Sequence, residues 1–449
     1  MIDISTLSKF ASELEFHDIP QSVIRKMKIS LVYNLSIALA GRQAARPALE
    51  LVFKLENKRY NDQPWIRADE LSLDHVAFAN ACIVTARSQN ETLYDALAHT
   101  GCVIIPCALV LGEKLRINGK QLLTGLVAGY EATAAVAEGF ADATTKKGFR
   151  ATALFSPFGA AVTSAKILGS SQEQIETTLA MVANFAAGTM QHWIDGTDEW
   201  LFQVGNSSKS GIISAMIAVE RDTKGTAHAL TGPAGFYRAH AQDVTFYPSD
   251  WLGESWKSEN IQYKPFPGCA LSQTAIHSAI GIKNKYRIDP LQIKKITVWM
   301  NPDEHNYPGV QGRPPLSGRG GAIMSISFAM ALCFLFGSVK NSDFDKFNDP
   351  QISAFMDKIF SRSSDNLSKQ SCKIDVELIN GQIYTELLDM SENNIFLFDW
   401  TKVTDFSRNL LPEMNISINK LKEIIKTIDD LEDIDDVSQL TSLLSPVQV

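Results

Sequence analysis

Along the first 260 residues, apolar side chains recur at spacings of three and four, which places them on one face of an α-helix. We predict helices over 19–41, ended by Gly41, and over 118–140. Small residues recur at the helix-facing positions of this region. The pattern therefore indicates closely packed helices in a large all-helical domain.

Two further helices are predicted between the second helix and residue 190. One begins at Pro157 and ends at Gly169, because proline is tolerated in the first helical turn and glycine favours helix ends. The next follows Ser171 and Gln174, which have the spacing of a capping box.

The pattern changes after the turn Lys-Pro-Phe-Pro-Gly at 264–268. Residues 294–300 alternate between apolar and polar, as a half-buried strand does, and 371–389 form two such runs joined by Asn380-Gly381, a strong hairpin signal. With apolar helical runs at 271–286 and 322–337, these strands indicate an α+β unit.

These patterns predict a fold that is mainly α, with an α+β second domain. We place the large all-helical domain at 1–262 and the smaller α+β domain at 263–391. Residues 392–449 contain a final helical stretch, which we expect to pack back on the first domain and complete it.

Composition narrows the class of protein. The 449 residues carry a formal net charge of -8 and are 45% hydrophobic, so the chain is globular and an interaction with nucleic acid is not expected. The six cysteines form no CxxC pair, and the eight histidines lack metal-ligand spacing, so we expect neither a metal site nor a disulfide framework.

We see no signal peptide and no apolar run long enough to span a membrane, and we expect a cytoplasmic protein without membrane contact. The small-residue helices of 118–220 favour a homodimer.

Candidate chemistry begins in the segment NETLYDALAHTG at 90–101, where Asn90, Glu91 and Thr92 precede the lone His99. If the residues between them are irregular, these side chains converge on one pocket. His99 taken alone has the plainer interpretation of a helix cap or a core histidine.

Four further segments combine polar side chains with glycine or proline. Arg150 precedes a helix, and a guanidinium beside a helix N-terminus suits a carboxylate. Trp200 and Gln203 lie in a region dense in aromatic and amide groups. Lys264 opens the proline turn, and Gln273 lies in the helix after it. Each segment also has a structural interpretation without a functional role: Arg150 as a surface arginine, the Trp200 segment as a subunit interface, and Lys264 as a solvated lysine. The last segment, 306–325, contains Tyr307 and is either a lid or a long surface loop.

In this order the segments resemble the MmgE/PrpD family, which includes 2-methylcitrate dehydratase, cis-aconitate decarboxylase and iminodisuccinate epimerase. The resemblance covers essentially the whole chain and rests on NETLYDALAHTGCVIIPCALVLGE, GFRATALFSPFGAAVTSAKILG, FQVGNSSKSG, YKPFPGCALSQ and YPGV. It implies a helical domain, a smaller α+β domain, an active site between them, a dimer, and no metal or organic cofactor.

Thr92, His99 and Lys264 match active-site positions that the resemblance implies. At other positions the chain departs from the dehydratase and decarboxylase pattern: Asn90-Glu91 replaces Asp-Asp, Arg150 and Gln273 replace histidines, and Trp200 replaces a lysine. The Arg, Trp-x-x-Gln and Gln variants are closer to the epimerase-like branch.

We therefore expect a cofactor-independent enzyme that removes and returns a proton at a carbon next to a carboxylate or carbonyl of a small carboxylate-bearing substrate. His99 is the expected base, with Thr92, Lys264 and a second acid/base, Glu91, as the other catalytic groups. The substrate-binding residues are expected to be Asn90, Arg150, Trp200, Gln203, Gln273 and Tyr307. A lyase acting on a dicarboxylate or tricarboxylate, and a biosynthetic cyclase acting on a larger substrate, are the alternatives; a non-catalytic binding protein is the least favoured.

Overall fold

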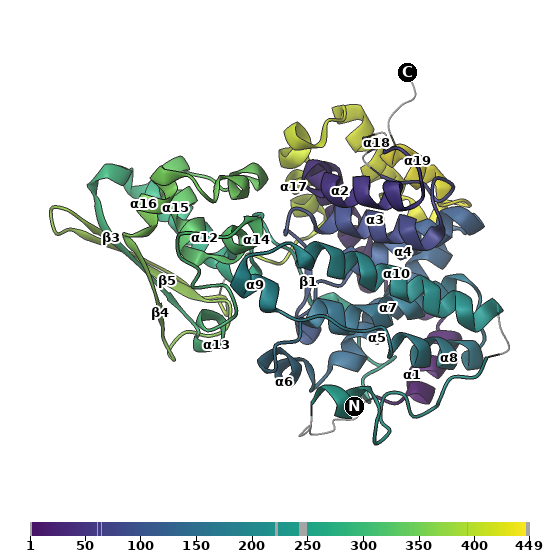
Figure 1. Ribbon diagram of the computed structural model, residues 1–449. Helices are drawn as coiled ribbons and strands as arrows, with labels where there is room; N and C mark the ends of the chain where they lie inside the picture. Colours follow the sequence, from purple (N-terminus) through teal and green to yellow (C-terminus); the bar gives the residue numbers. More distant parts are fainter. Residues whose placement is uncertain are drawn as a thin grey trace.

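The computed structural model describes residues 2–60, 62–63, 65–220, 223–241, 249–392 and 394–445. Figure 1 shows two parts joined side by side, one made of helices and one built on a small sheet. The chain is mainly α with an α+β second part, as the sequence predicts. Among the described residues, no helix has both the length and the apolar character needed to cross a membrane.

The helical part is a stack of long helices whose mutual faces are almost entirely apolar. Its N-terminal and central helices are α1 (Ile4–Glu13), α2 (Gln21–Leu55), α3 (Leu73–Thr85), α4 (Gly101–Leu115), α5 (Gly119–Ala137), α6 (Ala141–Lys146), α7 (Ala151–Ile167), α8 (Gln172–Val182), α9 (Gln191–Asp195), α10 (Glu199–Glu220) and α11 (Phe236–His240). Helix α8 begins at the predicted capping box: the Ser171 N–H donates to Gln174 Oε1 over 2.9 Å.

Two predicted helix boundaries are wrong. Helix α2 continues through Gly41 to Leu55, because this glycine permits a close helix approach rather than a helix end: a Cβ there would lie 2.9 Å from Arg87 Cγ. Helix α7 begins at Ala151, and Pro157 lies inside it.

The C-terminal helices lie against the helical part, at the top of Figure 1. They are α17 (Trp400–Met414), α18 (Ile418–Asp429) and α19 (Ser438–Leu444). The Ser36 hydroxyl of α2 donates to Ser407 of α17 over 2.8 Å, and the Gly119 N–H donates to the Ile434 carbonyl over 2.8 Å. The end of the described chain is therefore fastened to α2 and to the start of α5.

The α+β part holds a four-stranded sheet in the order β4-β3-β5-β6. Its strands are β3 (Ile293–Met300), β4 (Ile359–Ser363), β5 (Cys372–Leu378) and β6 (Ile383–Leu388), and its helices are α12 (Gln273–Tyr286), α13 (Pro302–His305), α14 (Arg319–Met324), α15 (Ile326–Phe336) and α16 (Pro350–Met356). The predicted strand at 294–300 and the hairpin at Asn380-Gly381 are confirmed, and Gly381 has the positive φ of 87° that such turns use. The predicted helix at 322–337 is two helices, since the Ser325 hydroxyl caps the second.

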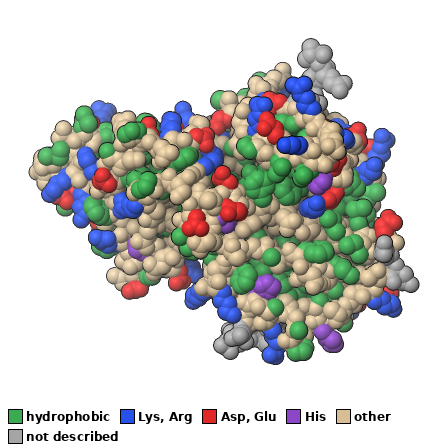
Figure 2. All heavy atoms as spheres, in the orientation of Figure 1, with side chains coloured by type: hydrophobic (Ala, Val, Ile, Leu, Met, Phe, Trp, Pro, Cys, Tyr) green, Lys and Arg blue, Asp and Glu red, His purple; other side chains and the backbone are tan. Residues whose placement is uncertain are grey.

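Hydrophobic side chains gather on the visible face of the helical part (Figure 2). Phe78 of α3 and Phe202 of α10 are only partly buried and lie 6.4 Å apart, and Met216 and Val219 of α10 are exposed. We propose on this ground that the chain is a homodimer. Static light scattering at micromolar concentration is expected to give twice the monomer mass, and a stable monomer would contradict the proposal.

The attachment of the C-terminal segment gives a stability prediction at Gly119. A Cβ at this position would lie 1.6 Å from the Leu431 carbonyl oxygen, a backbone atom that cannot move alone. Gly119→Ala is expected to lower the free energy of unfolding by about 1–3 kcal/mol, the usual cost of overpacking. The control is Gly281→Ala in α12, where nothing lies within 4 Å of the new Cβ and up to about 1 kcal/mol of stabilisation is expected. Equal unfolding midpoints for the two variants would contradict this prediction.

Candidate active site

A cavity of about 480 Å³ lies where the helical and α+β parts meet. Its walls come from the loop before α4, from α6, from the start of α7, from the proline turn and from α13 with the turn after it. Six of the predicted site residues line it: Asn90, Thr92, His99, Arg150, Lys264 and Tyr307.

A short backbone ladder brings three of these residues together. Strand β1 (Thr92–Leu93) pairs antiparallel with β2 (Ile261–Gln262), which places Lys264 near Thr92 although the two are far apart in sequence. Within the segment, the Leu93 N–H donates to the Ala98 carbonyl over 2.9 Å, and Leu97 takes a left-handed φ of 51°. This tight turn folds His99 back against Thr92.

The imidazole of His99 is held through Nδ1. This nitrogen lies 2.9 Å from the Glu91 carbonyl oxygen and 3.2 Å from Thr92 Oγ1. Because a carbonyl only accepts hydrogen bonds, Nδ1 carries the proton and Nε2 keeps a free lone pair. Among the described residues no group hydrogen-bonds to Nε2, so this lone pair is available to a ligand in the cavity.

The surroundings of His99 oppose its protonation. Burial, and after it the positive charges of Lys264 and Arg150, hold the pKa of His99 well below its ordinary value. The ring is therefore neutral at pH 7, as a base must be before it accepts a proton.

Lys264 is almost fully buried, at 3% exposure. Its ammonium group donates to the Ser88 carbonyl over 2.9 Å and to the Gly268 carbonyl over 3.1 Å, which leaves its third N–H without a partner among the described residues. Burial lowers the pKa of Lys264 to about 8. The lysine is therefore mostly charged at pH 7, with one donor left for a ligand.

Arg150 is 5% exposed and precedes the first residue of α7. One guanidinium nitrogen, Nη1, donates to the Trp200 carbonyl over 2.7 Å and lies 3.4 Å from Gln203 Oε1. The guanidinium also lies 5.3 Å from the centre of the Trp193 ring. Ala151 and Thr152, at the N-terminus of α7, line the cavity beside it. This arrangement suits a carboxylate.

Neither buried cation has a carboxylate partner among the described residues. Lys264 is held by carbonyl oxygens, and Arg150 by a carbonyl and an amide. A buried charge without a counter-ion is costly, so proteins rarely keep one without a role. The cavity is therefore built to receive negative charge next to an unprotonated histidine.

Two residues of the first candidate segment are tied into the helical part instead. The Glu91 side chain is fully buried and accepts hydrogen bonds from Tyr130 and from Asn34 Nδ2, so it does not line the cavity; its carbonyl is what orients His99. Asn90 lines the cavity, but its side-chain amide accepts from the Thr85 hydroxyl and donates to the Val84 carbonyl. These two hydrogen bonds cap the C-terminal end of α3.

Three predicted binding residues support the cavity without lining it. Trp200 and Gln203 hold Arg150, as described above. The Gln273 amide accepts from the Phe266 N–H over 3.0 Å and donates to the Cys269 carbonyl over 3.1 Å, which fixes the turn that carries Lys264. We therefore correct their expected role: they position cations rather than contact substrate.

Several residues that line the cavity were not predicted from the sequence. Trp193, Tyr94 and Glu304 line the cavity, as do Asp142, Asp303 and Lys369 at its charged edge. Trp193 stacks on Trp200 with ring centres 5.8 Å apart. The aromatic-rich segment therefore correctly indicated a cavity wall, but the tryptophan that lines the cavity is Trp193 and not Trp200. The acidic Pro-Asp-Glu-His turn at 302–305 carries no such signal.

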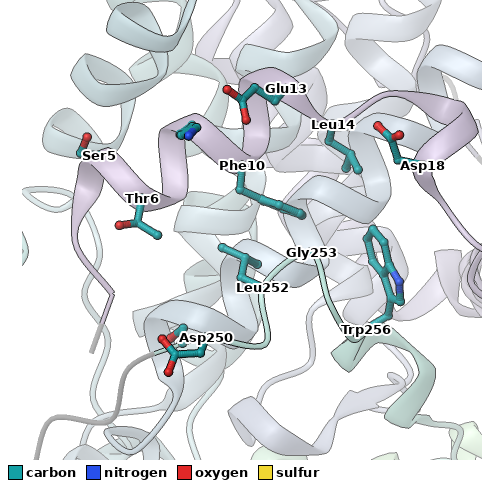
Figure 3. Close-up of a pocket in the computed structure, with 12 residues that line it drawn as sticks. Ser5, Thr6, Phe10, Glu13, Leu14, Asp18, Asp250, Leu252, Gly253 and Trp256 are labelled. Carbon is teal, nitrogen blue, oxygen red and sulfur yellow. The ribbon is translucent and has the colours of Figure 1, made fainter.

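A more open hollow lies between α1 and residues 249–256, lined by Lys9, Glu13, Asp18 and Asp250 with Phe10 and Trp256 (Figure 3). Its acidic side chains outnumber its one lysine, so it suits a carboxylate poorly. Within the described ranges, no three His, Cys, Asp or Glu side chains gather as a metal site.

The sequence comparisons agree with this architecture. The model of the MmgE/PrpD N-terminal domain matches residues 5–248, and that of the MmgE/PrpD C-terminal domain matches residues 266–391. The chain belongs to the MmgE/PrpD family. Curated relatives include a cis-aconitate decarboxylase of Aspergillus terreus, 19% identical over 86% of this chain and 84% of its own length. Another is a cis-aconitate decarboxylase-like protein of Aspergillus oryzae, 22% identical over 76% of this chain and 74% of its own length.

The hydrogen bonds of His99 predict one tautomer over a wide pH range. Because Nδ1–H donates to the Glu91 carbonyl and the pKa is lowered, Nε2 should carry no proton between pH 6 and 8. NMR of protein labelled with ¹⁵N-histidine measures this directly, and the His99→Asn variant assigns the signal. A titration of this signal near pH 6.5 would contradict the structure's electrostatics.

Proposed function

We propose that the chain catalyses proton abstraction and return at a carbon next to a carboxylate of a small substrate, as an epimerase or isomerase does. The observation that carries this proposal is the pairing of two buried cations, Arg150 and Lys264, with the neutral His99 in one cavity.

The proposed chemistry follows from the charges. His99 Nε2 takes the proton from the carbon, and the electron pair of the C–H bond moves into the adjacent carboxylate as an enolate. Lys264 and Arg150 donate hydrogen bonds to the oxygens on which negative charge develops, and burial strengthens this stabilisation. The proton then returns to carbon, and no cofactor is needed in this scheme.

The charges of the cavity lining limit how many carboxylate groups the substrate can carry. Two buried cations balance two carboxylates, and the rest of the lining, with Lys146 and Lys369 against three carboxyl groups, adds no net positive charge. We therefore favour a monocarboxylate or dicarboxylate.

Decarboxylation is the second candidate, supported by the names of the relatives. In that reaction the C–CO₂ bond breaks, the carbanion is stabilised by the same cations, and a proton is added to carbon. Incubation in deuterated water with a panel of dicarboxylates distinguishes the two. Deuterium next to the carboxylate in an intact carbon skeleton supports the epimerase or isomerase, and release of carbon dioxide supports the lyase.

Substitution of the base gives a quantitative prediction. His99→Asn is expected to lower turnover by about 10²–10⁴-fold, the usual contribution of a positioned acid or base, with the fold intact by circular dichroism. The control is His277→Asn, which changes an exposed histidine of α12 outside the cavity lining and should leave turnover unchanged. Normal turnover in His99→Asn would remove the histidine from the mechanism.

A further inference from the structure

Glu304 is a buried carboxyl group in the cavity that the proposed chemistry has not yet used. It belongs to α13 of the α+β part, and its residue is 6% exposed. One oxygen, Oε1, accepts the Gln370 N–H over 2.8 Å. Among the described residues the other oxygen has no hydrogen-bond partner, and the side chain lines the cavity.

Neighbouring charges leave Glu304 without a strong partner. Lys369 ion-pairs instead with Asp303 and with Asp142 of α6, at 3.8 Å each. The lysine therefore ties the α+β part to the helical part at the cavity edge, where α13 faces α6 across the junction in Figure 1, but it makes no ion pair with Glu304. The Gln370 N–H and the charge of Lys369 favour the carboxylate form of Glu304, the smaller effect of Asp303 opposes it, and burial outweighs all three.

Three other titratable groups lie within the electrostatic reach of Glu304. They are the hydroxyl of Tyr94, from the segment between β1 and His99, and the thiols of Cys269 and Cys372. None of them supplies positive charge. Burial, more than any neighbour, raises the pKa of Glu304 to about 7, so at neutral pH the group is close to an equal mixture of acid and carboxylate.

We propose that Glu304 is the second proton-transfer residue of the site, serving the substrate from the α+β part while His99 serves it from the helical part. This inference rests on the proposed function and deepens it, since an epimerase needs a proton acceptor on one face of the carbon and a donor on the other. It also moves the role that the sequence suggested for Glu91 to a residue in the cavity.

The proton balance closes with these two groups. The C–H bond breaks toward His99 Nε2, which becomes an imidazolium, and its electron pair enters the enolate. The Glu304 carboxylic acid gives its proton to the opposite face of the carbon and becomes a carboxylate. In the reverse reaction the Glu304 carboxylate takes the proton, and the His99 imidazolium, which exists only during turnover, returns one; exchange with solvent then resets both groups.

The test compares Glu304→Gln with Asp303→Asn, which alters the adjacent, ion-paired carboxylate. Each variant is incubated in deuterated water with single enantiomers of malate, aspartate and methylsuccinate. Glu304→Gln should lose interconversion of enantiomers by about 10²–10⁴-fold yet keep deuterium exchange in the enantiomer whose hydrogen faces His99. His99→Asn should lose that exchange, and Asp303→Asn should keep both activities within a few-fold.

The pH profile adds a readout that a structural role would not change. Exchange of the enantiomer whose hydrogen faces Glu304 requires the carboxylate, so its rate should rise as pH increases through about 7. That rise should be absent from Glu304→Gln. Interconversion in Glu304→Gln equal to that of the wild type, or equal loss of exchange in both enantiomers, would overturn the proposal.

An infrared titration keeps the inference testable if no panel member reacts. Absence of exchange in the wild-type protein counts against the proposed function itself. Glu304 is then judged by the carbonyl stretch of its protonated carboxyl group, obtained as the difference between wild type and Glu304→Gln at pH 6 and pH 8. The band should be present at pH 6 and weaker at pH 8; its absence at pH 6 would overturn the role of Glu304 as a proton donor.

Discussion

The burial of two positive charges without a carboxylate partner is the constraint on which the site depends. Lys264 and Arg150 are kept in place by neutral oxygen atoms, which satisfy their hydrogen bonds but do not cancel their charge. The lowered pKa of Lys264 reports what that burial costs the folded protein. Burial first, and the same uncancelled charge after it, keep His99 neutral, so the buried cations serve both the anion site and the base.

The surrounding fold also fixes the backbone beside Lys264. The Tyr33 hydroxyl of α2 accepts from the Lys264 N–H over 3.1 Å, and it also contacts the carbonyl oxygen of Gln89, next to the first candidate segment. Its ring stacks on Phe406 of α17, with ring centres 4.9 Å apart. The C-terminal helices therefore support the cavity through α2, although no residue of theirs lines it.

The sequence predicts what depends on local patterns and fails where tertiary contacts decide. The Ser171 capping box and the Asn380-Gly381 hairpin are local, and both form. Gly41 fails as a helix end because its missing side chain admits Arg87 from the turn after α3, a contact that is distant in sequence. At the site, all ten chosen residues line the cavity or hold a neighbour that does. Periodicity does not tell the two roles apart: Trp200 holds Arg150 through its backbone carbonyl and the Gln273 amide binds the backbone of the proline turn, whereas Trp193 lines the cavity. Glu304 was missed because an acidic turn usually faces solvent; only the packing of the second part around α13 buries it.

The site is divided between the two parts of the chain, and this division explains how one cavity holds both a proton acceptor and a proton donor. His99 and Arg150 belong to the helical part, where burial favours the neutral imidazole. Glu304 lies on the short helix α13 of the α+β part, where its carboxyl group accepts the Gln370 N–H and the adjacent Asp303 ion-pairs with Lys369. Burial acts on an acid and on a base in opposite directions: it keeps the imidazole unprotonated and raises the proton affinity of the carboxyl. One buried junction therefore produces a proton acceptor and a proton donor at the same pH, which is the requirement for moving a proton across a carbon without a net change of charge in the cavity.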